Sequence, residues 1–188
     1  MNILLGFIGT IIGAAAILGA GIFAESYKRH RDRQGTASAL AGEIHAILNI
    51  SERRKYVEAF ESFAKLLEQG QQVIIPRFLA RPLELDPVVD RYLGNLGALG
   101  GELPKKITTF HSFLLGIRHD LVRLADGAFD FDLAMKARVI REDLALWKDT
   151  VTLGSELVGS LDKIATELWW LESWCQKACA WRRGRRSV

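Results

Sequence analysis

The chain has 188 residues, 49% of them hydrophobic, and a formal net charge of +3, so it holds about one folded domain beside any membrane-spanning segment. The charge is segregated: residues 25–33 and 182–186 are basic, whereas residues 34–181 hold 17 basic and 20 acidic residues. We therefore expect no nucleic-acid partner, because a nucleic-acid reader carries its positive charge on the folded domain itself.

The N-terminal segment, residues 3–24, reads ILLGFIGTIIGAAAILGAGIFA and contains no charge and one polar side chain, Thr10. A helix of this length rises about 33 Å, which is enough to cross a hydrocarbon core of about 30 Å. The alternative is a cleaved signal peptide. No basic residue precedes Ile3, and Ile22-Phe23-Ala24 is a poor cleavage site, so the sequence favours an uncleaved transmembrane anchor.

The orientation of this anchor follows from its flanks. Lys28, Arg29, Arg31 and Arg33 lie just after the apolar segment, and no basic residue lies before it. Positive charge is retained on the cytoplasmic side of a membrane. We expect a single-pass protein of the bacterial inner membrane, with its N-terminus outside and its C-terminal domain in the cytoplasm.

Small residues recur along one face of the anchor at spacings of three and four: Gly6, Gly9, Gly13, Ala16 and Ala20. Such a face lets two helix backbones approach closely in lipid, so it predicts a homo-oligomer that associates through the membrane. The alternative is that glycine and alanine are simply common in membrane helices.

The first part of the remaining chain reads as one helix over residues 37–68, with Thr36 as its N-cap. Its apolar positions are Leu40, Ile44, Ile47, Phe60, Ala64 and Leu67. Residues 70–86 contain two prolines and predict an irregular crossing segment. Asp86-Pro87 predicts the start of a short helix that ends near Gly94.

Two further helices follow a glycine-rich turn at Gly97, Gly100 and Gly101. Pro104 opens the first, which ends at Gly127 and has apolar residues at Ile107, Phe110, Leu114, Ile117, Leu121 and Leu124. Asp130 or Asp132 caps the second, which is expected to reach about Trp181, with glycines at 154 and 159 as possible bends. Its seam is Leu133, Ala137, Ile140, Leu144, Trp147, Val151, Gly154, Val158, Leu161, Ala165 and Leu168.

These patterns predict an all-α protein: one N-terminal transmembrane helix and an antiparallel helical bundle, with coiled-coil-like seams and a long C-terminal helix. No strand alternation of useful length is present, which argues against an α/β enzyme fold. The expected domains are an anchor at 1–27, a basic juxtamembrane linker at 28–36, the bundle at 37–183 and a basic tail at 184–188.

The uncharged anchor, its basic stop, SALAGEIHAILNISERRKY at 38–56 and LGALGGELPKKITTFHSFLLGI at 96–117 together give a recognisable layout. This layout resembles small single-pass membrane proteins of proteobacteria. The resemblance covers most of the chain. It implies the layout of helices and turns, and it carries over no activity.

The sequence predicts no catalytic residue, metal site, cofactor or small-molecule substrate. His45, His111 and His119 do not share the spacing of converging ligands, so we expect surface or capping histidines. Cys175 and Cys179 lie one turn apart, where core packing is favoured over a metal site. The glycines at 97–101 lack the Lys-Ser/Thr that follows in a phosphate-binding loop.

The C-terminal stretch holds a stripe of tryptophans followed by arginines: Trp170, Trp174, Trp181, Arg182, Arg183, Arg185 and Arg186. On a continuous helix this stripe faces away from the main seam. Amphipathic rings and cations suit the headgroup layer of a membrane. Two alternatives stay open, namely a second buried face and contact with a protein partner.

The sequence therefore favours a non-enzymatic, membrane-tethered adaptor or scaffold that self-associates, with membrane lipid and a possible protein partner. One alternative is a phage- or stress-related membrane effector, such as a lysis accessory or toxin-like protein. Lysis spanins, however, place their coiled domain outside, opposite to the charge bias here. The other alternative is an enzyme acting on lipid at the membrane surface.

Overall fold

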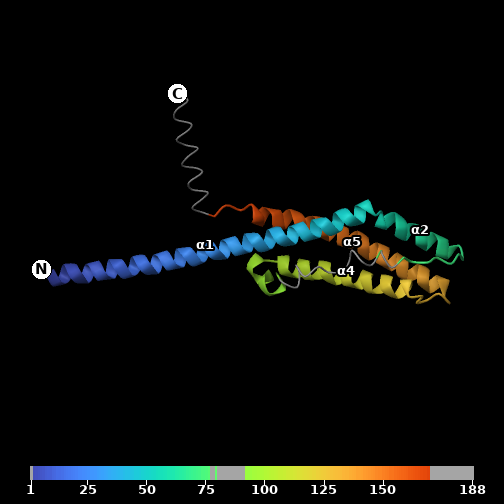
Figure 1. Cartoon of the computed structure of the whole chain (residues 1–188), viewed down its shortest axis with the longest axis horizontal. Helices are drawn as coiled ribbons and strands as arrows, with labels where there is room; N and C mark the ends of the chain where they lie inside the picture. Colours follow the sequence, from blue (N-terminus) through green and yellow to red (C-terminus); the bar gives the residue numbers. More distant parts are fainter. Residues whose placement is uncertain (1, 77–78, 80–91, 170–188) are drawn as a thin grey trace, which may run out of the picture. The chain divides into compact units, whose positions relative to one another are not determined.

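The computed structural model describes residues 2–76, 79 and 92–169, and at residues 2–12, 14–16 and 93 it describes the backbone alone. Every regular element within these residues is helical, which confirms the all-α prediction for this part of the chain. The elements are α1 (Asn2–Arg53), α2 (Tyr56–Glu68), the 3-10 helix η3 (Leu93–Leu99), α4 (Leu103–Ala125) and α5 (Leu133–Ala165) (Figure 1).

The chain divides into two compact units. Unit 1 comprises Met1–Gly35 and Ala165–Val188, and unit 2 comprises Thr36–Ile164. Helix α1 contributes residues to both units. Among the residues described, we find no helix that combines the length and the apolar character needed to cross a membrane.

Helix α1 passes through residues 34–36 without a break, so the predicted N-cap at Thr36 is wrong. The basic stretch at 28–36 is likewise helical. Thr36 and Ala37 are buried in unit 2, with at most 4% of their surface exposed. Gly35 disfavours helix by only about 1 kcal/mol, which burial of the following turn easily outweighs.

The single helix predicted over residues 37–68 is broken in the structure, because α1 ends at Arg53 and α2 begins at Tyr56. Lys55 between them adopts a left-handed conformation with φ of 52°. Tyr56 is buried, donates its hydroxyl hydrogen to the Leu79 carbonyl at 3.0 Å, and packs against Trp147 with 5.5 Å between ring centroids. The break therefore coincides with an aromatic residue that enters the core, and no glycine or proline marks it.

Unit 2 is a helical bundle in which the C-terminal part of α1 and then α2, which continues beyond its end, run alongside α4 and α5 (Figure 1). Most predicted seam positions are buried. They are Leu40, Ile44, Phe60, Ala64, Leu67, all six apolar residues of α4 from Ile107 to Leu124, and Ala137, Ile140, Leu144, Trp147, Gly154 and Leu161. Gly154 lies at a tight contact, where an added Cβ would meet Phe110 of α4 and both Ile44 and Leu48 of α1. The bundle prediction is confirmed.

The turns of unit 2 match the sequence signals closely. Pro104 lies in the first turn of α4, and Gly100 and Gly101 adopt φ of 73° and 60°. Gly97 instead belongs to η3. Asp132, and not Asp130, caps α5 by accepting a hydrogen bond from the Met135 amide at 2.9 Å.

Helix α5 ends at Ala165, so the prediction that it continues to about Trp181 is wrong at residues 166–169. The seam predicted through Leu168 stops with the helix, and Leu168 is exposed. Residues 170–188 lie outside the described residues. So does the predicted helix start at Asp86-Pro87.

Candidate functional site

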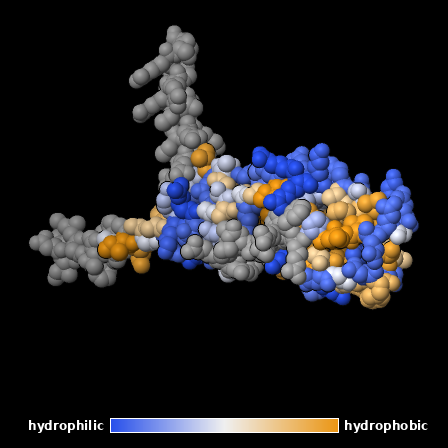
Figure 2. Space-filling view, turned by 45° about the vertical axis from the view of Figure 1, so that its right-hand side comes forward, coloured by the Kyte–Doolittle hydropathy of each residue, from blue (hydrophilic) through white to orange (hydrophobic). Residues whose placement is uncertain are grey.

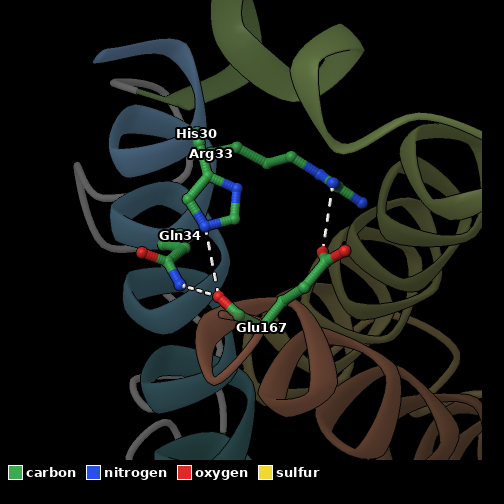
Figure 3. A network of polar contacts seen from close by, with 4 residues as sticks. All are labelled: His30, Arg33, Gln34 and Glu167. Carbon is green, nitrogen blue, oxygen red and sulfur yellow. Dashed lines mark hydrogen bonds and ion pairs between the residues drawn. The ribbon is translucent and has the colours of Figure 1, made fainter. Parts of the chain in front are cut away.

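Among the described residues of unit 1, a polar network surrounds Glu167, which lies two residues after the end of α5 (Figure 3). The Glu167 carbonyl lies 2.6 Å from Gln34 Nε2 and 3.1 Å from His30 Nε2. The Glu167 carboxylate lies 3.2 Å from Arg33 Nη1. We call His30, Arg33, Gln34 and Glu167 the Glu167 network.

The three donors of this network come from a single turn of α1. Residues at i, i+3 and i+4 share a helix face, so His30, Arg33 and Gln34 point toward the same neighbour. Because a carbonyl oxygen only accepts, His30 meets it as a donor with a proton on Nε2. The network thus supplies side-chain donors to a carbonyl that the helix no longer satisfies.

Nothing in the local sequence explains where α5 ends, since no glycine or proline lies between Gly159 and Gly184. The chain instead leaves the helix where Glu167 and Trp169 meet α1. The Trp169 ring packs edge-on against Tyr27, with 5.1 Å between centroids and 68° between planes. Contacts within unit 1 therefore accompany the end of α5.

Just before Tyr27, the described part of α1 presents apolar side chains on several sides. Ile17, Leu18 and Ile22 are 75%, 68% and 72% exposed, and Phe23 is about half exposed. Ile17 and Leu18 are adjacent in sequence and so point about 100° apart around the helix. Figure 2 shows this stretch as hydrophobic surface beside the grey atoms at its left.

Basic side chains follow at once along α1. Lys28, Arg29 and Arg31 are exposed. Arg29 pairs with Glu25 one turn earlier at 2.9 Å, and the hydrogen bond from Arg29 holds the pKa of that carboxyl below its ordinary value. Along this part of α1, apolar side chains are thus followed by an aromatic residue, Tyr27, and then by basic side chains.

Unit 2 contains two buried charged residues on α5 at a seven-residue spacing. Lys136 donates to the Val73 carbonyl at 3.0 Å and to the Asp130 carboxylate. Asp143 is also buried, and its Oδ2 lacks a hydrogen-bond partner among the described residues. Burial, and to a lesser degree the charges of Asp120 and Glu142, raises the pKa of the Asp143 carboxyl to about 8.

These buried groups do not form a catalytic arrangement within the described residues. Asp143 Oδ2 meets no hydrogen-bonding side chain, and no group of three or more metal-ligating side chains occurs in the part of the chain described. Of the histidines weighed from the sequence, His45 and His119 are exposed. The expectation of a surface histidine is wrong for His111, which is buried edge-on against Phe110 because it lies beside the apolar seam of α4.

The predicted association face is described in part. Gly13 and Ala20 are exposed, and a Cβ added at Gly13 meets nothing within 4 Å in the single chain. Gly6, Gly9 and Ala16 lie outside the residues whose side chains are described. The stripe of Trp170, Trp174 and Trp181, the arginines at 182, 183, 185 and 186, and both cysteines also lie outside the described residues.

Sequence reasoning missed Tyr27, His30, Gln34, Glu167 and Trp169 as a set. Two signals for them were present. Tyrosine and tryptophan are enriched at the edges of membrane-spanning segments, and Tyr27 follows the apolar run at 3–24 by three residues. His30 and Gln34 have the i,i+4 spacing of a common helix face. Their shared partner, Glu167, lies 137 and 133 residues away and has no signal in the sequence. No protein-family model, curated protein or solved structure matches the chain.

Proposed function

We propose that the protein is a membrane-tethered helical adaptor or scaffold that self-associates. Residues 3–24 form its single anchor in a bacterial inner membrane, with the N-terminus outside and unit 2 in the cytoplasm. The observation that carries the proposal is the exposure of Ile17, Leu18 and Ile22 around α1. A helix that is apolar on all sides is stable when protein or lipid covers it, and each such side chain gains about 1.5–3 kcal/mol when covered.

The orientation rests on the charges after the apolar run. Lys28, Arg29, Arg31 and Arg33 follow it within nine residues, and no basic residue precedes it. Positive charge stays on the cytoplasmic side during insertion. An alkaline phosphatase domain fused after Val188 is therefore expected to be inactive, whereas a green fluorescent protein fused there fluoresces. An active phosphatase reverses the orientation.

The adaptor role rests on the surface of unit 2. Ile74 and Phe131 are 89% and 92% exposed, and both lie in loops, where a partner can reach them. Figure 2 shows hydrophobic residues among hydrophilic ones at the right-hand end of the molecule. We take these two side chains as the points at which a protein partner makes contact. A filled helical core beneath them supplies a rigid support.

Membrane attachment is tested by placing charge in the anchor of the full chain. Gly13→Arg with Ile17→Arg adds two arginines to the apolar run, each costing about 2.5–3.5 kcal/mol near the centre of a span. We expect this variant to leave the membrane fraction on alkaline extraction and to stop floating with vesicles. The matched control, Ile74→Arg with Phe131→Arg, adds the same charge to unit 2 and is expected to float normally. Loss of flotation in neither variant, or in both, contradicts the anchor.

Self-association is tested in the anchor as well. A Cβ at Gly13 meets nothing within 4 Å in the single chain, so we expect a larger residue there to act through a second copy. Gly9→Ile and Gly13→Ile are expected to weaken the signal of the span in a membrane two-hybrid assay. Gly21→Ile, which lies outside the small-residue face, serves as the control. An unchanged signal from both Gly9 and Gly13 variants removes this face as the association surface.

A further inference from the structure

Tyr27 lies at the level where a membrane-spanning helix leaves the hydrocarbon. It follows Ala24, the last residue of the apolar run, by three residues, or about 4.5 Å of helix rise. The headgroup layer extends several ångströms beyond the hydrocarbon core. Tyrosine and tryptophan are enriched at this depth because the ring is apolar and its polar tip meets water.

Trp169 shares this level because it packs against Tyr27 within unit 1. The two rings meet edge-on with 5.1 Å between centroids, and neither is fully buried. Leu168 beside Trp169 is 44% exposed. An aromatic pair that the protein leaves partly exposed is suited to the boundary between lipid tails and headgroups.

The Glu167 network fixes the position of Trp169 relative to α1. Two donors, His30 and Gln34, bind the main-chain carbonyl of Glu167, and Arg33 binds its carboxylate (Figure 3). These contacts hold the backbone two residues before Trp169. The aromatic pair is therefore held in place by three side chains of one helical turn.

The charge next to the pair complements anionic headgroups. Lys28, Arg29 and Arg31 are exposed directly after Tyr27. Of the nearby acids, Glu25 is paired with Arg29 and Glu167 with Arg33, which leaves Asp32 as the other negative side chain on this stretch of α1. Each cation near an anionic surface contributes about 1 kcal/mol.

We propose that Tyr27 and Trp169, held by the Glu167 network, form a second contact of the protein with the bilayer, in the layer of anionic lipid headgroups. The chain thus returns to the membrane surface after unit 2 and does not touch it through the anchor alone. This inference rests on the proposed anchor. It concerns a tryptophan outside the stripe that the sequence singled out.

Tryptophan emission tests the contact in the full chain. Trp170→Phe, Trp174→Phe and Trp181→Phe leave two tryptophans, and Trp147 is buried in unit 2 and serves as an internal report on folding. The protein is placed in vesicles of phosphatidylcholine and phosphatidylglycerol that carry a nitroxide either on the headgroup or deep in the acyl chain. We expect the headgroup nitroxide to quench Trp169 more strongly than the deep one does.

Further variants assign this quenching. Trp169→Phe is expected to abolish it, and Tyr27→Ala to reduce it. His30→Ala with Gln34→Ala removes both donors to the Glu167 carbonyl and is expected to reduce it as well. His45→Ala is the matched control, since His45 is an exposed histidine of the same helix that lies in unit 2, outside the proposed contact. The single variant His30→Gln keeps a side-chain donor at position 30 and is expected to retain the quenching.

The two proposals fail in different ways. Protein that floats with the vesicles but shows no headgroup quenching of Trp169 leaves the anchor standing and overturns the second contact. Protein that does not float overturns both. Quenching that is equal in the His30/Gln34 double variant and in the parent overturns the role of the Glu167 network.

Discussion

The large apolar side chains of the helix seams are buried in unit 2, whereas those described on α1 in unit 1 are exposed. Leu40 and Ile44 of α1 have no exposed surface, whereas Ile17 and Ile22 of the same helix are more than 70% exposed. A water-soluble helix hides one apolar stripe and shows a polar face. The two ends of α1 are therefore built for different surroundings, a protein core for one and, as we propose, lipid for the other.

The largest difference in stability between variants of the two units is expected for the core of unit 2. Trp147→Ala removes a buried ring that packs on Tyr56 and is expected to lower the free energy of unfolding by about 3–5 kcal/mol. Ile22→Ala, an equally apolar truncation in unit 1, is expected to change the unfolding of unit 2 by less than about 0.5 kcal/mol. Chemical denaturation in mild detergent, followed by circular dichroism, measures both. Equal effects contradict the division into units.

Two glycines of α5, Gly154 and Gly159, test how tightly unit 2 is packed. A Cβ at Gly154 lies 2.8 Å from Phe110 Cε2, 3.3 Å from Leu48 and 3.4 Å from Ile44, so Gly154→Ala overpacks the core and is expected to destabilise unit 2 by about 1–3 kcal/mol. Gly159→Ala on the same helix meets nothing within 4 Å and is expected to stabilise it by up to about 1 kcal/mol. Thermal melts of the two variants should move in opposite directions. A gain at both positions means that Gly154 is not tightly packed.

The pH dependence of unit 2 isolates its buried carboxyl. The pKa of Asp143 is raised to about 8 in the folded chain against an ordinary value of 3.8, so between these values the folded state binds the proton that the unfolded state has lost. Stability therefore falls as pH rises from about 4 to about 8. Asp143→Asn is expected to flatten this slope and to stabilise unit 2 by about 1–3 kcal/mol at pH 8.

Denaturation at pH 5 and pH 8 measures this change. Asp149→Asn, at an exposed position of the same helix, is the control and is expected to keep the slope of the parent. The raised pKa of Asp143 is contradicted if the stability of the parent rises between pH 5 and pH 8 and the Asp143→Asn variant shows the same pH dependence.

The smallest expected effect concerns surface ion pairs. Arg141 binds Glu68 through two hydrogen bonds of 2.6 and 2.8 Å, and both side chains are about half exposed. A double-mutant cycle with Arg141→Ala and Glu68→Ala is expected to give a coupling of about 0.2–1 kcal/mol that weakens in salt. A coupling that is large and insensitive to salt shows that this pair stabilises the bundle as a buried contact does.

The sequence predicted those parts of the fold that rest on local periodicity. The three-and-four spacing from Ile107 to Leu124 matches a fully buried face of α4, and Pro104 and Gly127 mark its ends. It failed where a tertiary contact decides the backbone. The break at Lys55 coincides with the entry of Tyr56 into the core, and the end of α5 coincides with contacts to residues of α1 that are more than 130 positions away.

The candidate site divides in the same way. The order of apolar, aromatic and basic residues along α1 is local and visible in the sequence. The pairing of Tyr27 with Trp169 and of His30 with Glu167 is not, because nothing in the helical periodicity ends α5 before these residues. A pattern that predicts a continuous helix to Trp181 does not predict that Trp169 packs against Tyr27.

Site-directed spin labelling tests most directly whether the exposed apolar residues of α1 lie in lipid. A nitroxide is attached to the full chain in vesicles at Ile17→Cys or at Ile74→Cys, with Cys175 and Cys179 replaced by serine in both. Both positions are isoleucines more than 70% exposed, one on α1 in unit 1 and the other in a loop of unit 2. We predict that oxygen reaches the label at residue 17 and a water-soluble nickel chelate does not, whereas the chelate readily reaches residue 74. Equal access of the chelate to both labels would contradict the membrane anchor.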